Sequence, residues 1–411
     1  MARATATASI LFNNDDNTIF ISDIPASIAE AQHLDHREWN PRRLLSCPPR
    51  NEPYPSTEPK SQKARAKVLN HDPDRGIHDE YAKLIQDASS TIKASNGETH
   101  DFCLERAVAE DEQLEQLDQP RKRKRSEPRR ETIGDGHELS VPPSDSVTST
   151  EVLRNGTDVP KEVTLQLSSD DLSPDRSSTY TLPPQSMVLL GDCSDTATFR
   201  SAAREYASHG RFDMIVMDPP WPNRSVSRSS SYGTTGLPEL VDMLLSMDLD
   251  IHLKSGGFIA VWITNRAAVR DAVLGTSGLF ESWGVQVCEE WVWCKVTQQG
   301  KPISKVDGLW RKPYEVCLIG KRSLGTNNAP STIKRRVIFA VPDLHSRKPC
   351  LKGLFERLLL GQQDADSMPA VLEIFARCAV AGWMSWGNEA IKYNNNDYWS
   401  TMPERRRDAV L

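Results

Sequence analysis

The chain has 411 residues, including 27 prolines, and a formal net charge of −6. This length allows two or three domains, and the proline content indicates that part of the chain does not pack into a core. The negative net charge excludes a global electrostatic argument for nucleic-acid binding, which must therefore depend on local basic patches.

The 8 cysteines form no Cys-x-x-Cys pair, and Cys288 and Cys294 have no His at metal-ligand spacing. We therefore expect reduced, mostly buried thiols in an intracellular protein, and no metal site. The sequence contains neither an N-terminal hydrophobic signal region nor an apolar run of about 18 residues, so we expect neither secretion nor a membrane span.

In chain order, residues 1–119 predict a small accessory region. Ser9–Phe12 and Thr18–Ile24 have the pattern of short strands, and Asp79–Lys93 and Phe102–Leu117 have apolar residues at helical spacing. We expect this region to take part in nucleic-acid recognition. Its basic residues would extend a phosphate-binding track: Arg37, Arg42, Arg43, Lys60, Lys63 and Arg65.

Residues 120–184 have the composition of a disordered linker, with a basic run followed by a tract rich in Ser, Thr, Asp and Pro. The dense run Arg121–Arg125 has two interpretations. It is either a nuclear import signal, which predicts a nuclear protein, or a solvated charge cluster, which leaves the cytoplasm open.

From residue 185 to 411 the pattern alternates between strands and helices. A helix is expected near Leu237–Met247 and another in Lys352–Leu360, between apolar runs that predict strands. This alternation predicts one doubly wound sheet, and we expect residues from about 185 onward to hold the entire sheet. No glycine-rich dinucleotide or P-loop motif is present, which argues against those ligand sites.

The apolar run Phe212–Met217 ends in Asp218, Pro219, Pro220 and Trp221. Ligands bind at the carboxyl ends of strands in open α/β sheets, and prolines there offer carbonyl acceptors without N–H donors. This turn suits an exocyclic amine: Asp218 and the Pro219 carbonyl accept its two protons, and Trp221 offers a flat face to its ring. The alternative is a proline turn closed by a core tryptophan.

Eight motifs in order give residues 187–400 a specific resemblance to one family. They are LLGDC, MDPPWPNRSVSRS, VWITNR, EEWVWCKVTQQG, RKPYEVCLIG, LHSRKP, LEIFARC and GWMSWGNE. This series resembles the adenine N6-methyltransferases related to the catalytic subunit of the mRNA adenosine methyltransferase, and among them the branch of methyltransferase-like protein four. The resemblance implies a Rossmann-like class I methyltransferase fold with a mostly parallel, doubly wound sheet, a permuted motif order and a small N-terminal extension.

The resemblance also implies S-adenosylmethionine as the methyl donor, without a metal. Asp192 and the Cys193 backbone would face the adenine of the donor, and Lys348 would pair with its carboxylate. Carboxylates and amides suit the ribose hydroxyls, and a lysine suits a carboxylate. The residues assigned to the ribose and its surroundings are Glu373, Asn388, Arg377 and Glu389.

The acceptor implied by the resemblance is adenine in nucleic acid, with RNA ahead of DNA. A small nuclear RNA is the expected RNA, with either adenosine or 2′-O-methyladenosine as the acceptor, and Asn223, Arg224, Arg228 and Lys312 would contact it. The protein would act as a monomer or as a heterodimer with a paralogue. Two alternatives remain: a catalytically silent nucleic-acid-binding scaffold, and methylation of a free amine or a protein side chain.

Overall fold

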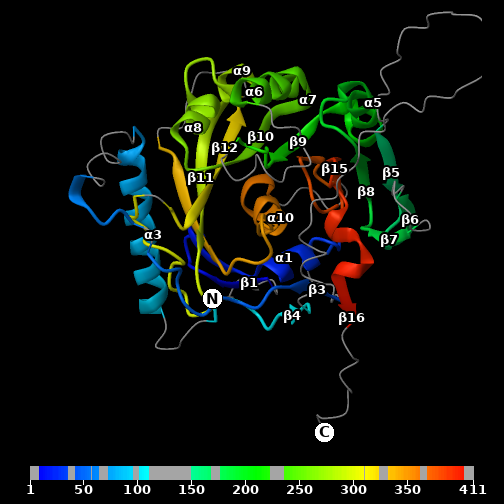
Figure 1. Cartoon of the computed structure of the whole chain (residues 1–411). Helices are drawn as coiled ribbons and strands as arrows, with labels where there is room; N and C mark the ends of the chain where they lie inside the picture. Colours follow the sequence, from blue (N-terminus) through cyan, green and yellow to red (C-terminus); the bar gives the residue numbers. More distant parts are fainter. Residues whose placement is uncertain are drawn as a thin grey trace, which may run out of the picture.

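The computed structural model describes residues 9–35, 42–56, 58–63, 73–95, 101–110, 150–167, 176–222, 236–309, 311–323, 332–361 and 368–401. Its centre is a sheet of eleven strands in the order β1-β2-β13-β11-β12-β10-β9-β14-β15-β8-β5 (Figure 1). Their bounds are β1 Ile10–Asn13, β2 Ile19–Ser22, β5 Glu151–Asn155, β8 Ser186–Leu190, β9 Phe212–Met217, β10 Leu253–Ile263, β11 Val285–Lys295, β12 Tyr314–Arg322, β13 Lys334–Ala340, β14 Val371–Ile374 and β15 Trp383–Gly387.

Most strand pairings in this sheet are parallel. Within the described residues, six of the ten strand pairings are parallel, including β9 with β10 and β9 with β14. Met217, the last residue of β9, lies opposite Val261 on one side and Ile374 on the other. The predicted α/β class is therefore confirmed, and β9 ends between two parallel neighbours.

Helices cover both faces of the sheet. Successive side chains of a strand point to opposite faces of the sheet. In β9, Ile215 and Met217 pack into the hydrophobic layer on one face, and Met214 and Val216 pack into the layer on the other face. The first layer receives α3 (Arg75–Ser95), α5 (Thr196–Tyr206), α6 (Leu237–Ser246), α8 (Ala267–Leu274) and α9 (Leu279–Ser282), and the second α1 (Ile24–Glu30) and α10 (Lys352–Phe355). The short α7 (Leu249–His252) precedes β10, and a π-helical turn, Glu356–Leu360, follows α10.

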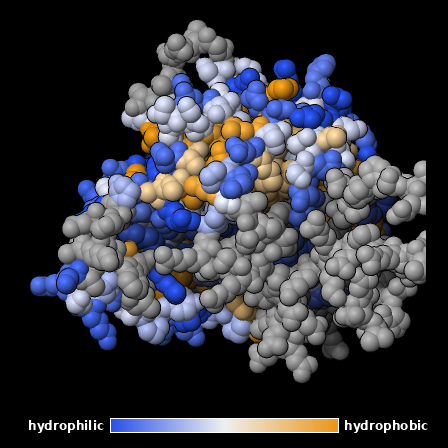
Figure 2. All heavy atoms as spheres, turned by 45° about the horizontal axis from the view of Figure 1, so that its top comes forward, coloured by the Kyte–Doolittle hydropathy of each residue, from blue (hydrophilic) through white to orange (hydrophobic). Residues whose placement is uncertain are grey.

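The helices at the top of Figure 1 leave some apolar surface. Figure 2 shows apolar side chains in a band across the face that is turned forward there. Helix α6 buries Leu240 and Leu244, whereas Val241 and Met243 on the same helix are only partly buried. Helix α6 therefore carries apolar side chains outside the face that packs on the sheet as well as on that face.

The N-terminal region is part of the core, which corrects the expected boundary at residue 185. Strand β2 pairs in parallel with β13, Phe20 lying opposite Ile338, and both Phe20 and Ile21 are fully buried. A second sheet joins the chain's two ends: β3 (Arg42–Ser46) lies between β16 (Trp399–Thr401) and β4 (Ala107–Val108). Short strands are not stable alone, so these segments need the rest of the sheet.

The two early strands and the helix in Asp79–Lys93 are confirmed as β1, β2 and α3. The helix predicted for Phe102–Leu117 is wrong as far as residue 110, where the described residues end. This segment is extended, and Ala107 pairs with Leu45 in β3. The Leu104 N–H donates to Asp23 at 3.0 Å, so tertiary contacts override the helical spacing of the segment.

Part of the predicted linker is also structured. Strand β5 pairs antiparallel with β8, Leu153 opposite Val188, and β6 (Lys161–Leu167) pairs with β7 (Arg176–Leu182). An edge strand needs apolar residues on only one face, which explains why β5 has no strong sequence signal. Arg121–Arg125 lies outside the described residues. No helix in the described ranges is long and apolar enough to cross a bilayer.

Candidate active site

Asp218 follows the last residue of β9 and lies at the carboxyl edge of the sheet. Its Oδ2 lies 3.1 Å from the ammonium of Lys348, and 38% of its side chain remains exposed. The carbonyl of Pro219 accepts the Trp221 N–H at 2.7 Å, which tightens the turn. A carbonyl has two lone pairs, so Pro219 can accept a second hydrogen bond while this one persists.

Trp221 does not offer the open stacking face that the sequence predicted. It is 3% exposed, and its indole N–H donates to the Trp262 carbonyl at 2.7 Å. The ring therefore fixes the turn to β10, which agrees with the alternative of a core tryptophan. A base can stack on this ring only after a movement that uncovers it.

Lys348 joins two carboxylates. Its ammonium lies 2.8 Å from Glu315 in β12 as well as 3.1 Å from Asp218, and Glu315 also pairs with Lys295 in β11. Burial alone would lower the pKa of Lys348, but the charges of Asp218 and Glu315 outweigh burial and raise it. Burial opposes ionisation of Glu315, yet the two lysines lower its pKa to about 2.

A pocket of about 750 Å³, its open mouth included, lies beside this ion pair. It is lined by Ile28, Ala31, Val216, Met217, Asp218, Trp262, Ser346, Arg347, Lys348, Pro349, Cys350, Leu351, Phe355, Glu373, Phe375, Arg377, Cys378, Val380, Trp383 and Tyr393. Four predicted residues thus share one cavity: Asp218, Lys348, Glu373 and Arg377. Burial, with a contribution from the charge of Asp218, raises the pKa of Glu373 to about 8.

The other predicted donor residues lie outside the pocket lining. The Glu389 carboxylate lies 3.4 Å from Arg377 and 3.3 Å from Lys392, so it supports the arginine at the pocket wall. Asn388, the neighbour of Glu389 after β15, is half-buried. Of the two residues predicted to hold the ribose hydroxyls, only Glu373 faces the cavity.

Asp192 and Cys193 follow β8, two strands away from β14. Asp192 is exposed and accepts the Ser194 N–H at 2.8 Å, while the Cys193 thiol is fully buried and burial raises its pKa. Neither residue lines the pocket. Lys312 is half-buried ahead of β12 and also lies outside the lining. Asn223, Arg224 and Arg228 lie outside the described residues.

Some residues at this site were not predicted. Glu315 had one signal, a carboxylate inside the otherwise apolar run Tyr314–Gly320, which indicates a buried partner. Ile28 and Ala31 come from α1 and its end, and no local signal connects them with the pocket.

The cavity fits the methyl donor implied by the sequence. Lys348 and Arg377 supply cations for a carboxylate, and Glu373 supplies oxygens for ribose hydroxyls. The apolar side chains of Phe375 and Trp262 provide surface for a nucleoside.

Comparison with known proteins identifies the domain that contains this site. The MT-A70 family model matches residues 212–389, from the first residue of β9 to Glu389. These residues are a domain of the MT-A70 family. The match confirms the resemblance seen in the sequence, and the MT-A70 domain contains Asp218, Glu315, Lys348 and Glu373.

Three relatives extend this match. The chain is 45% identical over 190 residues to "N6-methyladenosine RNA methyltransferase MTA1" of Cryphonectria parasitica, covering 46% of this chain and 54% of the relative. It is 29% identical over 428 residues to the protein of the same name in Pyricularia oryzae, covering 98% and 99%. It is 33% identical over 261 residues to mouse "N(6)-adenine-specific methyltransferase METTL4", covering 61% and 49%. The matches thus span about half the length of the first and third relatives.

Proposed function

We propose that this protein transfers a methyl group from S-adenosylmethionine to the N6 amine of adenine in nucleic acid, with RNA ahead of DNA as the substrate. The observation that carries this proposal is that Asp218, Lys348 and Glu373 line one pocket, with Asp218 paired to Lys348. The names of the MT-A70 relatives support adenine as the acceptor, and those of the two fungal relatives support RNA.

We also assign the MT-A70 domain to the permuted class I methyltransferases. Strand β14, which carries Glu373 at the donor pocket, comes after β9 in the chain but lies beside it in the sheet. The acceptor motif therefore precedes the donor half in sequence, while both reach the same edge. The sheet order supports this assignment because ligands of open α/β sheets bind outside the carboxyl ends of the strands, and Asp218 and Glu373 lie near that edge.

The chemistry expected of the protein follows from its own groups. The adenine amine is nearly planar because its lone pair is delocalised into the ring. Hydrogen bonds from this amine to Asp218 and the Pro219 carbonyl favour pyramidal nitrogen and stabilise developing positive charge. Lys348 holds Asp218 in place, and Asp218 accepts the proton that the amine releases. The donor, when bound, supplies a methyl group activated by a sulfonium.

A small nuclear RNA, with adenosine or 2′-O-methyladenosine as the acceptor, remains the proposed RNA, and the nucleus remains the proposed location. The second candidate is a silent scaffold that binds nucleic acid for an active partner. The complete ion pair between Asp218 and Lys348 favours the enzyme, since a scaffold does not require it.

The purified full-length chain should methylate adenosine in RNA when it is given S-adenosylmethionine. Mass spectrometry of nucleosides from treated RNA and DNA oligonucleotides measures N6-methyladenine in each. RNA and DNA from cells with and without the gene then identify the natural substrate. Binding of RNA without any methylation would support the scaffold and contradict the enzyme.

Lys348→Met should weaken donor binding and turnover together. It removes the cation proposed for the donor carboxylate, a charge-assisted contact worth roughly 1.5 to 3 kcal/mol. It also leaves Asp218 and Glu315 without their shared partner. Isothermal titration calorimetry should show at least about tenfold weaker donor affinity. Unchanged affinity would refute the contact with the donor carboxylate.

Donor affinity should rise with pH up to about 8. Because burial raises the pKa of Glu373 to about 8, its carboxyl is protonated at neutral pH, whereas hydroxyls and a sulfonium favour the carboxylate. Each pH unit below 8 should therefore cost up to about tenfold in affinity. Glu373→Gln should make donor affinity nearly independent of pH in this range. A slope that persists in this variant would come from titration of the donor's own amine instead of Glu373. Parallel curves for the two proteins would contradict the role of Glu373.

A further inference from the structure

The segment between β13 and α10 carries Lys348 to the active site. Its first residue is Val341, and Lys348 near its end contacts both Asp218 and Glu315. The ammonium lies 3.1 Å from Asp218, so a shift of this segment by about 1 Å would break the contact. The position of this segment therefore controls how Asp218 is held.

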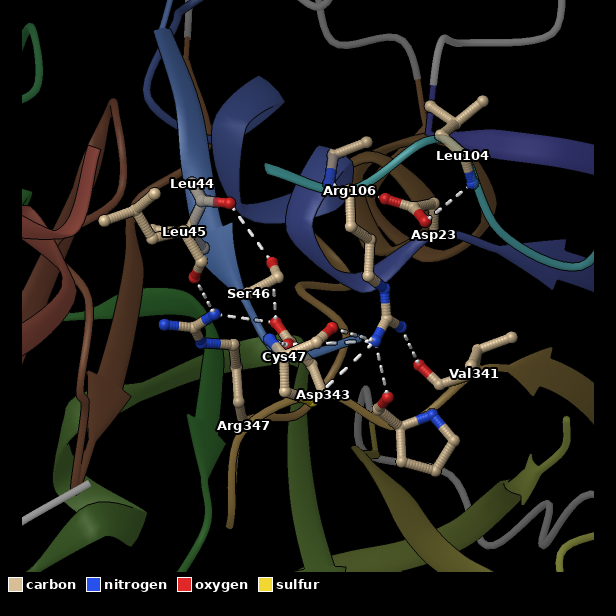
Figure 3. Close-up of polar contacts among 12 residues, drawn as sticks. Asp23, Leu44, Leu45, Ser46, Cys47, Leu104, Arg106, Val341, Asp343 and Arg347 are labelled. Carbon is tan, nitrogen blue, oxygen red and sulfur yellow. Dashed lines mark hydrogen bonds and ion pairs between the residues drawn. The ribbon is translucent and has the colours of Figure 1, made fainter. Parts of the chain in front are cut away.

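Arg106 of the N-terminal region holds the start of the segment. Its guanidinium donates to the carbonyls of Val341 at 2.8 Å, Pro342 at 2.9 Å and Cys47 at 3.1 Å (Figure 3). The side chain of Arg106 is 1% exposed. The planar guanidinium thus connects two consecutive carbonyls of the segment to the residue that follows β3. The ammonium of a lysine cannot reproduce this geometry.

Asp343 provides the second attachment, and its side chain is fully buried. Its carboxylate accepts the Cys47 N–H at 3.0 Å, the Ser46 hydroxyl at 3.2 Å and Arg347 at 2.6 Å. Arg347, which directly precedes Lys348, also donates to the Leu45 carbonyl at 2.8 Å (Figure 3). The segment is therefore fixed to β3 at both Asp343 and Arg347.

We propose that Arg106 is a positioning residue for the methyl transfer, acting through Lys348 on Asp218. This inference rests on the proposed function. Arg106 lies outside residues 212–389, so the inference gives a role in catalysis to a residue that the MT-A70 match does not include. The contacts of Arg106 with Val341 and Pro342 set where the segment begins, and the segment sets the distance from Lys348 to Asp218.

A double-mutant cycle in the full-length chain tests this coupling. Arg106→Met should lower kcat about hundredfold, as a displacement of about 1 Å at a reacting centre does, and change the KM for RNA less than about threefold. The Arg106 guanidinium lies 3.9 Å from the Asp343 carboxylate, so Arg106→Lys keeps a positive charge near Asp343 and should recover part of kcat. In the Lys348→Met background, Arg106→Met should change kcat less than about threefold, because its target is already absent.

Arg75→Met is the matched control. Arg75 also belongs to the N-terminal region but forms an exposed ion pair with Asp79 on α3, so kcat should stay unchanged. Thermal unfolding of each variant corrects kcat for the folded fraction. If Arg106→Met does not fold, Arg106→Lys is used in the same cycle.

An equal loss of kcat in both backgrounds would overturn the inference, because a general effect on the fold does not depend on Lys348. The inference is also overturned if the unfolded fraction of Arg106→Met accounts for its whole loss of kcat. These two results leave the proposed function intact, since the wild-type chain is then active. A wild-type chain that methylates no nucleic acid overturns both proposals.

Discussion

Asp218→Asn should lower kcat for methyl transfer by about a hundredfold to a thousandfold while leaving donor affinity within a few fold. The substitution retains the size of the side chain but removes the charge that stabilises the developing positive charge on the amine. Loss of one such group costs about a hundredfold to a thousandfold in kcat. A radiolabelled methyl-transfer assay measures turnover, and calorimetry measures donor binding.

Asp248→Asn is the control for this substitution. Asp248 forms a surface ion pair with Arg200 at 2.6 Å, and its φ of 51° is one that asparagine also adopts. This variant should keep its activity. If Asp218→Asn loses donor affinity as strongly as it loses turnover, Asp218 acts on the donor and its assignment to the acceptor is wrong.

A fragment that begins near Ser177 should fail to fold into a donor-binding protein. It retains the whole MT-A70 domain but lacks β1, β2, α1, β3, α3, β4, β5 and β6. The missing buried side chains include seven large ones: Phe20, Ile21, Ile24, Ile28, Tyr81, Ile85 and Ile92. At about 1.5–3 kcal/mol each, their loss is comparable to the whole 5–15 kcal/mol stability of a domain.

The fragment also lacks direct contacts with the site. Ile28 lines the pocket, and Ser27 accepts the Cys350 N–H at 2.9 Å. Circular dichroism on heating should show no cooperative transition for the fragment. The matched control is a chain lacking residues 120–149, whose composition predicts a linker, and it should bind the donor normally. A soluble fragment that binds the donor as tightly as the full chain would contradict the structural role of the N-terminal region.

The sequence predicted the elements whose signals are local. An unbroken apolar run followed by Asp218 and two prolines identifies the end of a buried strand, and the structure has β9 there. Lys348 and Glu373, which the resemblance assigns to the donor, line one pocket, and their contacts with the donor stay predictions. In these cases the pattern and the structure depend on the same few neighbouring residues.

The predictions failed where the structure depends on pairing between distant segments. Nothing near Phe20 indicates that its partner is Ile338, and nothing near Leu44 indicates Trp399. The contact of Glu315 with Lys348 joins β12 to the segment after β13, so only the carboxylate and not its partner could be inferred. Trp221 was assigned to the ligand because an indole has no linear signal that distinguishes core packing from stacking.

The pairing of the first strands with the last has a consequence for synthesis on the ribosome. Strand β2 completes its pairing only after β13 has been translated, and β3 pairs with β16 only after Trp399–Thr401 has been translated. Until β13 has been translated, Phe20 and Ile21, which are fully buried in the native sheet, lack the neighbouring strand β13. Such late, long-range pairing slows folding and exposes apolar surface, so the nascent chain should depend on chaperones more than its size alone implies.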